Sequence, residues 1–288
     1  GLSGIPQEAA AILTDKALMK EAFLKGGVSA STGMRVYSLT EARSAAERIG
    51  YPVVVKRVDS SGSRGITVVE QPERLEEAYY HATKRSTRDY VLVEGFIQGT
   101  EIGVDGFVQD GQLVFMAPHT KFVYRGKNTT IPVGHAFPYI CSQEVYDEIG
   151  RQMQAAVTAS GADRCSVNAD VFVDDNKISI IEMGGRTGAT CIPELISIYY
   201  GFDFYEKMIR SALGEQVEFN CTGRQPCMAK LLLSPIEGKI SHINIEGIRK
   251  LEEQGVTVSL DFPVGHKVFA MADGTDRIGH IIARTEDE

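Results

Sequence analysis

The chain has 288 residues, enough for about two domains, and its 43% hydrophobic and 24% charged composition is that of an ordinary globular protein. Its formal charge of −8 argues against a nucleic-acid surface, because phosphate backbones are bound by clustered lysines and arginines. Five cysteines without a C-x-x-C pair indicate neither a zinc site nor a disulfide framework, and reduced thiols suit a cytoplasmic protein. No signal peptide and no apolar run of about 18 residues is present, so no membrane segment is expected.

Three helices are predicted in the first third of the chain, from an N-cap or an early proline before each periodic run and a glycine after two of them. They cover residues 15–25 after Thr14, residues 41–49 after Thr40, and residues 72–85 beginning at Pro72. Between the second and third helices, residues 53–70 (VVVKRVDSSGSRGITVVE) are predicted to form two strands joined by a loop.

The rest of the chain mixes strands and helices without regular β-α-β alternation. Strands are expected at 90–97, at 101–118 with a turn at Asp110-Gly111, and at 166–183 with a turn near Asp175-Asn176. Helices are expected at 144–160, around 193–200 and at 203–213, with short strands after Gly223. This order predicts an α+β protein with more than one lobe.

The loop at 59–65 is the first candidate for a binding site. It differs from a P-loop, because Lys56 precedes it and a strand, not a helix, follows it; the dinucleotide glycine pattern fails for the same reason. Successive backbone N–H groups in a tight turn can bind anions, and Lys56 would hold a positive charge at the base. An exposed hairpin with a solvated lysine is the alternative.

Two later stretches carry carboxylates in patterns that suit a nucleotide and a metal. In residues 93–101, an extended segment could offer its backbone to a purine while a carboxylate accepts from ribose hydroxyls; a strand with surface acids is the alternative. Asp170 and Glu182 lie on the two arms of a predicted hairpin, where two close carboxylates favour a cation such as Mg²⁺. Arg186 follows in a glycine-rich turn and suits phosphate or carboxylate. A solvated hairpin is the alternative here.

Taken in order, four stretches resemble the ATP-grasp superfamily, in its carboxylate–amine ligase branch, which includes L-amino acid ligases and carbamoyl-phosphate-synthase-like proteins. They are TDKALMK, GYPVVVKRVDSSGSRGI, VEGFIQGTE and IEMGGRTGATCIPEL, and the tail FPVGHKVFAMADGTDRIGHIIA resembles the C-terminal subdomain. The resemblance implies two α+β lobes clasping ATP and a small β-rich C-terminal subdomain. It divides the chain into a helical segment (1–27), a lid with a phosphate flap (28–95), a central subdomain with the metal site (96–222) and the C-terminal subdomain (223–288).

The resemblance also implies a role for each motif residue. Lys16 and Lys56 would contact the ATP phosphates, Asp170 and Glu182 would hold Mg²⁺ or Mn²⁺, and Arg186 would stabilise the reacting centre. The flap would consist of Ser60, Ser61, Gly62, Ser63 and Gly65, adenine would lie against Glu94, Gly95, Phe96 and Ile97, and Glu101 would bind the ribose.

The sequence departs from the family in two places. The family usually has an asparagine where this chain has Gly184, so a ligand for a second metal is missing unless water or another residue, such as Asn168, replaces it. Family members also usually carry an N-terminal domain before the first lysine motif, where this chain has only about a dozen residues. A truncated chain or a separate subunit is therefore expected.

The implied reaction is phosphoryl transfer from ATP to a substrate carboxylate, followed by attack of an amine on the acyl phosphate. His135 and Gly188 are candidate substrate contacts, and residues 121–138, taken as a long loop, would carry acceptor specificity. The expected partners are a small carboxylate and a small amine, with the protein a homodimer. The alternatives are activation of bicarbonate, as in carbamoyl-phosphate synthesis or biotin carboxylation, glycinamide ribonucleotide synthesis, or a nucleotide-binding module without turnover.

Overall fold

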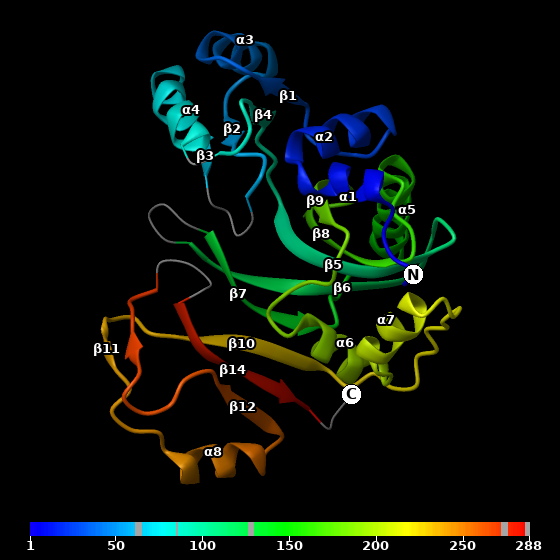
Figure 1. Ribbon diagram of the computed structural model, residues 1–288, viewed down its shortest axis with the longest axis vertical. Coiled ribbons are helices and arrows are strands. Elements are labelled where there is room, and N and C mark those ends of the chain that lie inside the picture. The colour runs from blue at the N-terminus through cyan, green and yellow to red at the C-terminus, as the bar shows by residue number, and fades with distance from the viewer. Residues whose placement is uncertain (61–64, 85, 126–129, 272–275, 286–288) are drawn as a thin grey trace. The chain divides into compact units, whose positions relative to one another are not determined.

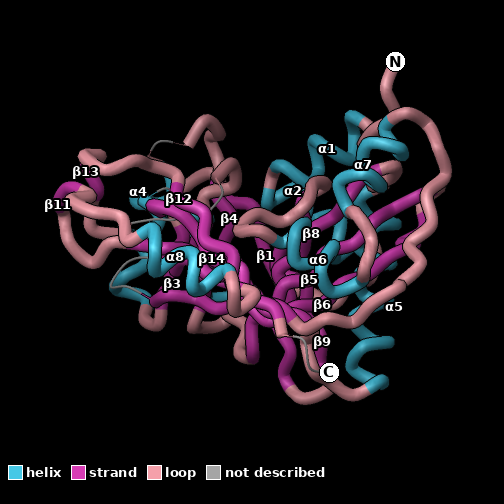
Figure 2. Tube along the Cα trace, turned by 90° about the horizontal axis from the view of Figure 1, so that it is seen from below, coloured by secondary structure: helices cyan, strands magenta, loops and turns pink. Residues whose placement is uncertain are grey.

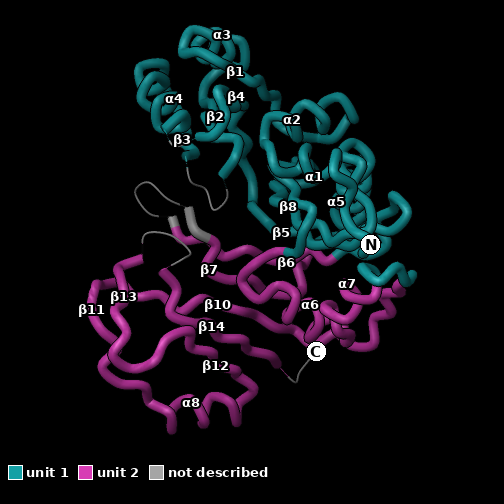
Figure 3. Tube along the Cα trace, viewed as in Figure 1, with its two compact units in different colours: residues 1–116, 141–187, 211–216 teal, residues 117–140, 188–210, 217–288 magenta. Residues whose placement is uncertain are grey.

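The structure is a computed structural model that describes residues 1–60, 65–84, 86–125, 130–271 and 276–285. The chain divides into two compact units, coloured separately in Figure 3. The first unit comprises residues 1–116, 141–187 and 211–216, and the second comprises residues 117–140, 188–210 and 217–288. The predicted division into four segments stays a prediction.

A small antiparallel sheet with two helices on one face forms one part of the first unit (Figure 1). Its strands, in spatial order, are β1 (Gly33–Val36), β4 (Val91–Gly95), β2 (Val53–Lys56) and β3 (Ile66–Val69). The helices are α3 (Leu39–Ile49) and α4 (Leu75–Thr83), the latter preceded by the 3₁₀ turn η1 (Pro72–Arg74). The two strands predicted around the 59–65 loop are confirmed as the antiparallel pair β2 and β3.

Strand alternation explains why a lysine follows three valines in β2. Val53 and Val55 belong to the apolar core that α3 and α4 cover. Side chains alternate between the faces of a strand, so Val54 and Lys56 lie on the opposite face. Glu94 pairs with Val54 on the neighbouring strand and therefore shares that face. The sequence pattern thus places two ionisable side chains together on the face that the apolar core does not use.

Three helices and a longer antiparallel sheet form the rest of the first unit. The helices α1 (Gln7–Thr14), α2 (Lys16–Lys25) and α5 (Gln143–Ser160) pack on one another and on β9 (Figures 1 and 2). The strands are β5 (Thr100–Gln109), the start of β6 (Gln112–Arg125), β8 (Cys165–Asp174) and β9 (Lys177–Gly184). Both predicted turns are confirmed, and Asp110 and Asp175 adopt the positive φ values, 52° and 50°, that tight turns require.

The two predicted threonine caps are wrong. Thr14 ends α1, a helix that was not predicted, and the N-cap of α2 is Asp15, whose carboxylate accepts from the N–H groups of Ala17 and Leu18. Ser38, not Thr40, caps α3. In both cases two residues of the capping type lie close together, and sequence preference alone does not choose between them.

The second unit is built on antiparallel strands that continue from β6. Neighbouring pairs are β6–β7, β7–β10, β10–β14 and β14–β12. Its further elements are β7 (Thr130–Phe137), α6 (Ile192–Tyr200), α7 (Phe204–Ala212, of which the last two residues belong to the first unit), β10 (Cys227–Leu233), β11 (Gly238–Lys239), α8 (Ile245–Glu252), β12 (Val256–Leu260), β13 (Lys267–Val268) and β14 (Arg277–Arg284). No helix in the described ranges is long and apolar enough to cross a membrane.

The long loop predicted at 121–138 is wrong. Most of this segment is strand: β6 continues to Arg125 and β7 begins at Thr130. Pro132 lies within β7, opposite Val123 and next to a register shift in the ladder. A strand tolerates proline at such an irregularity, because one ladder hydrogen bond is already lost there.

We expect Phe23→Ala to lower the free energy of unfolding by about 3–5 kcal/mol, because the Phe23 ring on α2 is fully buried and its removal leaves a cavity. Leu24→Ala is the matched control, since the next side chain is 40% exposed. Urea unfolding followed by far-ultraviolet circular dichroism suits this chain, which has no tryptophan. Equal losses for the two variants would contradict the burial of the Phe23 ring.

Candidate active site

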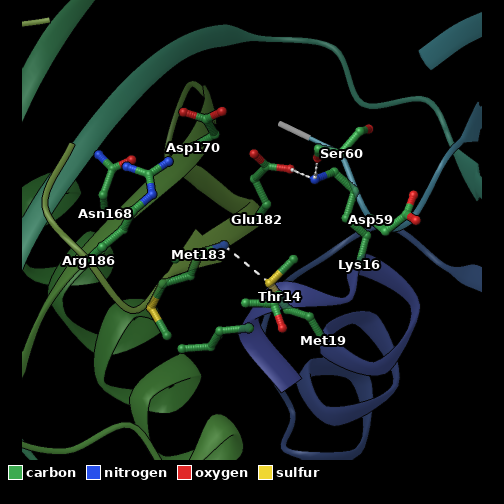
Figure 4. A pocket seen from close by; sticks show the side chains of 12 residues that line it. Thr14, Lys16, Met19, Asp59, Ser60, Asn168, Asp170, Glu182, Met183 and Arg186 are labelled. Carbon is green, nitrogen blue, oxygen red and sulfur yellow. Dashed lines mark hydrogen bonds and ion pairs between the residues drawn. The ribbon is translucent and has the colours of Figure 1, made fainter. Parts of the chain in front are cut away.

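A cavity of about 260 Å³ lies within the first unit, between the α1–α2 corner, the chain after β2, and the β8–β9 hairpin (Figure 4). The polar side chains that line it come from segments far apart in the sequence. They are Thr14, Lys16, Asp59, Ser60, Asn168, Asp170, Glu182 and Arg186. Five of the predicted site residues therefore meet here: Lys16, Ser60, Asp170, Glu182 and Arg186.

The predicted juxtaposition of the two acids is confirmed. Asp170 on β8 pairs directly with Glu182 on β9, and a register shift follows immediately after Asp170. Among the described residues no group of three His, Cys, Asp or Glu side chains gathers as a metal site. Two carboxylates nevertheless suit Mg²⁺, which usually takes one or two from the protein and completes its shell with phosphate oxygens and water.

Lys16 connects the acid pair to the chain that leads into the 59–65 loop. Its ammonium lies 3.0 Å from Glu182 Oε2 and donates to the backbone carbonyl of Ser60 at 2.8 Å. Lys16 is the first residue of α2, so the helix carries this charge directly to the cavity rim. A cation is thereby held between the metal-type carboxylates and the start of the loop.

Asp59 fixes the start of this loop. Its carboxylate accepts from the N–H of Thr87 at 2.7 Å and from its hydroxyl at 2.5 Å, and it pairs with Arg57. Burial opposes ionisation, but these donors outweigh it and hold the pKa of Asp59 well below its ordinary value. At the other end, the carbonyl of Gly65 accepts from the N–H of Arg57 at 2.9 Å. The predicted flap residues Ser61, Gly62 and Ser63 lie outside the described residues.

Two lysines hold one buried carboxylate next to the cavity. Glu94 forms ion pairs with Lys56 and, at 3.0 Å, with Lys20, and all three side chains are almost fully buried. Ser31 completes the group, because its hydroxyl accepts from Lys20 at 3.0 Å and donates to Glu94 at 3.2 Å. Gly33 leaves the room for Lys20, since a Cβ there would lie 2.8 Å from Lys20 Cγ.

The charges in this group are coupled. Burial alone would raise the pKa of Glu94, but Lys56 and Lys20 outweigh it and lower that pKa to about 2. Burial dominates at Lys20 and lowers its pKa. Burial also acts against Lys56, but the attraction of Glu94, Glu182 and Asp170 keeps its pKa above the ordinary value. Lys56 therefore lies within electrostatic reach of the acids in the cavity.

The prediction did not single out Lys20, although the quoted TDKALMK motif contains it. Residues four apart lie on one side of a helix, so Lys16 and Lys20 both face away from solvent on α2. The four-residue spacing of the two lysines could therefore have identified Lys20 from the sequence.

The segment predicted to hold adenine leaves β4 next to this group. The N–H of Gly95 donates to the carbonyl of Thr32 at 2.9 Å, and the N–H of Phe96 donates to that of Pro52 at 3.2 Å. A backbone contact with adenine would therefore use carbonyl groups and Ile97. Glu101, predicted for the ribose, lies near the start of β5 and is partly exposed.

Arg186 lies over Gly184, in the turn after β9. A Cβ at Gly184 would lie 3.6 Å from Arg186 Cγ, and Arg186 Nη1 donates to the carbonyl of Thr187 at 2.6 Å. The guanidinium is thus at the edge of the cavity that contains Asp170 and Glu182 (Figure 4).

The two predicted substrate contacts belong to the second unit. His135 on β7 is buried, with its Nδ1 3.2 Å from Nδ1 of the buried His119. Burial, with His119 and Lys121 adding to it, lowers the pKa of His135 to about 2, so this imidazole is neutral at physiological pH. Gly188 lies in the loop between β9 and α6.

The sequence of residues 49–194 matches the family described as the ATP-grasp domain. The chain belongs to the ATP-grasp family. The match includes the loop after β2, the β4 segment and the β8–β9 hairpin, so it covers most of the residues that form the cavity.

Similarity to known proteins extends beyond the residues that the family model matches. Over 238 residues the chain is 26% identical to an alanine–anticapsin ligase of Bacillus subtilis, a match that covers 73% of this chain and 48% of the relative. The chain thus spans about half the length of that relative. A phosphoribosylglycinamide synthetase structure from Anaerococcus prevotii is 27% identical, with a TM-score of 0.76 over 99% of this chain and 72% of that one. An L-amino acid ligase from Bacillus licheniformis shares the fold, with a TM-score of 0.82 at 19% identity over 99% and 70%.

We expect Glu94→Gln to lower the free energy of unfolding by about 3–5 kcal/mol, because it leaves two buried ammonium groups without a counter-charge. Lys20→Met should cost far less, since it leaves one neutral pair of Glu94 with Lys56 and a side chain of similar volume. Urea unfolding of both variants measures the difference. A larger loss for Lys20→Met would contradict the charge assignment.

The buried histidine pair predicts a pH dependence of stability. The folded pKa of His135 lies below the ordinary unfolded value of about 6.5, so the unfolded chain binds the proton first and stability falls as the pH drops below about 6.5. One such group contributes up to about 1.4 kcal/mol per pH unit. His135→Gln should reduce this slope between pH 6.5 and 5, whereas the exposed His242→Gln should not. Equal slopes in the two variants would contradict the burial of a neutral His135.

Proposed function

We propose that the protein is an ATP-dependent carboxylate–amine ligase. The observation that carries this proposal is the position of Lys16, whose ammonium contacts both Glu182 and the backbone at Ser60 in a cavity that Asp170 and Arg186 also line. Two acids opposite a lysine suit a cation and a phosphate chain between them. Membership of the ATP-grasp family and the ligase relative support the same conclusion.

Each part of the site would have a distinct task. Lys16 and Lys56 would bind the ATP phosphates, with the N–H groups near Ser60 and Gly65 closing over them. Asp170 and Glu182 would hold Mg²⁺, which when bound offsets the negative charge of the phosphate oxygens. The β4 segment through Ile97 would contact adenine, and Glu101 would contact the ribose.

The chemistry would proceed in two balanced steps. A carboxylate oxygen of the substrate attacks the γ-phosphorus, the bond to the β–γ bridging oxygen breaks, and ADP leaves. The amine nitrogen then attacks the acyl carbon, the carbon–oxygen bond to phosphate breaks, and the amine loses a proton. Negative charge grows on the acyl oxygen in the second step. Arg186, at the cavity edge, would stabilise that charge.

Phosphoribosylglycinamide synthesis is a second candidate, and the 27% identity to that synthetase over nearly the whole chain favours it. The two proposals differ in the amine. Phosphate release that requires an amino-acid amine would favour a peptide-type ligase, whereas release that requires a phosphorylated sugar amine would favour the second candidate. Bicarbonate-dependent ATP cleavage without an amino acid would refute both.

Several further expectations remain proposals. Mn²⁺ would serve in place of Mg²⁺, because both are hard cations that prefer oxygen ligands. We also propose a homodimer in the cytoplasm and a substrate wall completed by an N-terminal domain or a separate subunit. His135 would help to shape the substrate site as a neutral group, since its ring is buried beside His119. Gly188 would lie beside the acyl phosphate.

We expect the protein to release phosphate from Mg-ATP when it is supplied with the correct pair from a panel of amino acids and amines. Arg186→Ala should lower that turnover by about 100-fold or more, because one donor to a developing oxyanion is lost, while ATP affinity stays largely unchanged. The matched control is Arg164→Ala, since Arg164 pairs with Asp110 on the surface of the same unit. ATP binding without phosphate release under every condition would refute the ligase and favour a nucleotide-binding module.

A further inference from the structure

A row of three residues crosses the sheet beside the paired acids. Asp105 on β5 pairs with Asn168 on β8, and Asn168 pairs with Gly184 on β9. Asn168 is two residues before Asp170, and Gly184 is two residues after Glu182. Because side chains alternate along a strand, Asn168 therefore lies on the same face as Asp170, one step along the hairpin. Asn168 and both acids border the same cavity (Figure 4).

Asp105 determines which way the Asn168 amide points. The Asp105 carboxylate is fully buried and accepts from Asn168 Nδ2 at 2.8 Å. The NH₂ group of Asn168 is the donor in this hydrogen bond, so it faces the carboxylate. The amide oxygen of Asn168 then faces away from Asp105. Across the ladder is Gly184, which has no side chain of its own and is covered by the side chain of Arg186.

We propose that the Asn168 amide oxygen is a third protein ligand for the cation held by Asp170 and Glu182, and that Asp105 is the positioning residue that orients it. This inference rests on the proposed function of the cavity. A neutral oxygen suits this place, because a third carboxylate would add repulsion to an acid pair that already faces phosphate oxygens. A buried hydrogen-bond partner behind a metal ligand is the usual way in which its orientation is fixed.

The test is Mn²⁺ binding in the presence of ADP, followed by the electron paramagnetic resonance signal of free Mn²⁺. Asn168→Ala should weaken Mn²⁺ binding by about 10–100-fold, and Asp105→Asn by about 10-fold, because an asparagine at 105 no longer dictates the direction of the amide. Asn176→Ala is the matched control: Asn176 is in the exposed turn of the same hairpin and should leave Mn²⁺ binding unchanged.

Gly184, which pairs with Asn168 on the neighbouring strand, is the position for a variant that should restore Mn²⁺ binding. A Cβ at Gly184 would make only ordinary van der Waals contacts, the nearest at 3.6 Å from Arg186 Cγ, so the backbone accepts a side chain there. Gly184→Asn in the Asn168→Ala background should restore most of the Mn²⁺ affinity from the opposite strand. Unchanged Mn²⁺ affinity in Asn168→Ala, or an equal loss in Asn176→Ala, would overturn the inference.

The Mn²⁺-binding test of the ligand assignment can fail or succeed independently of the phosphate-release test of the ligase. Mn²⁺ affinity that depends on Asn168, in a protein that never releases phosphate, would support the ligand assignment and refute the ligase. Phosphate release that needs Mn²⁺, with Mn²⁺ affinity independent of Asn168, would support the ligase and overturn the assignment.

Discussion

One buried carboxylate shared by two lysines joins the parts of the first unit on which the site depends. Glu94 comes from β4, Lys56 from β2 and Lys20 from α2, so the ion pairs attach the helix to the sheet on the face that the valine core leaves free. Ionised groups are buried only when they are paired, so Glu94 cannot be removed without leaving two buried ammonium groups that lack a counter-charge. The position of α2 is therefore fixed, and Lys16, at the start of that helix, is fixed with it.

The charge arrangement around the cavity follows from this attachment. Two lysines and one glutamate leave a net positive charge beside the cavity, and Lys16 adds another at its rim. Asp170 and Glu182 place negative charge on the hairpin across from them. A polyphosphate with a divalent cation matches this pattern, because its oxygens can face the lysines while the cation faces the acids. Asp59, held by Thr87 and Arg57, keeps the start of the 59–65 loop next to the same cavity.

The predictions that succeeded depend on short-range pattern. The Asp110-Gly111 and Asp175-Asn176 turns begin both hairpins. The second turn sets the register as far as Val171, which pairs with Ile180, and the register shift after Asp170 then pairs Asp170 with Glu182. The strands around the 59–65 loop were predictable from their valines. Two kinds of prediction failed. One was a choice between near neighbours, as at Thr14 against Asp15. The other was the long loop at 121–138, most of which forms the β6–β7 pair.

The sequence by itself determined the motif order, the hairpin that carries the two acids and the face of β2 on which Lys56 lies, because alternation and turn chemistry are local properties. Only the tertiary structure decided that Lys20 meets Glu94, that Lys16 contacts Glu182 and the Ser60 carbonyl, and that Asp105 orients Asn168. These contacts join residues between 44 and 166 positions apart, and their formation depends on how α2 and β5 pack against the hairpin and the small sheet. No local pattern records that packing, since it is set by burial of side chains from the whole unit.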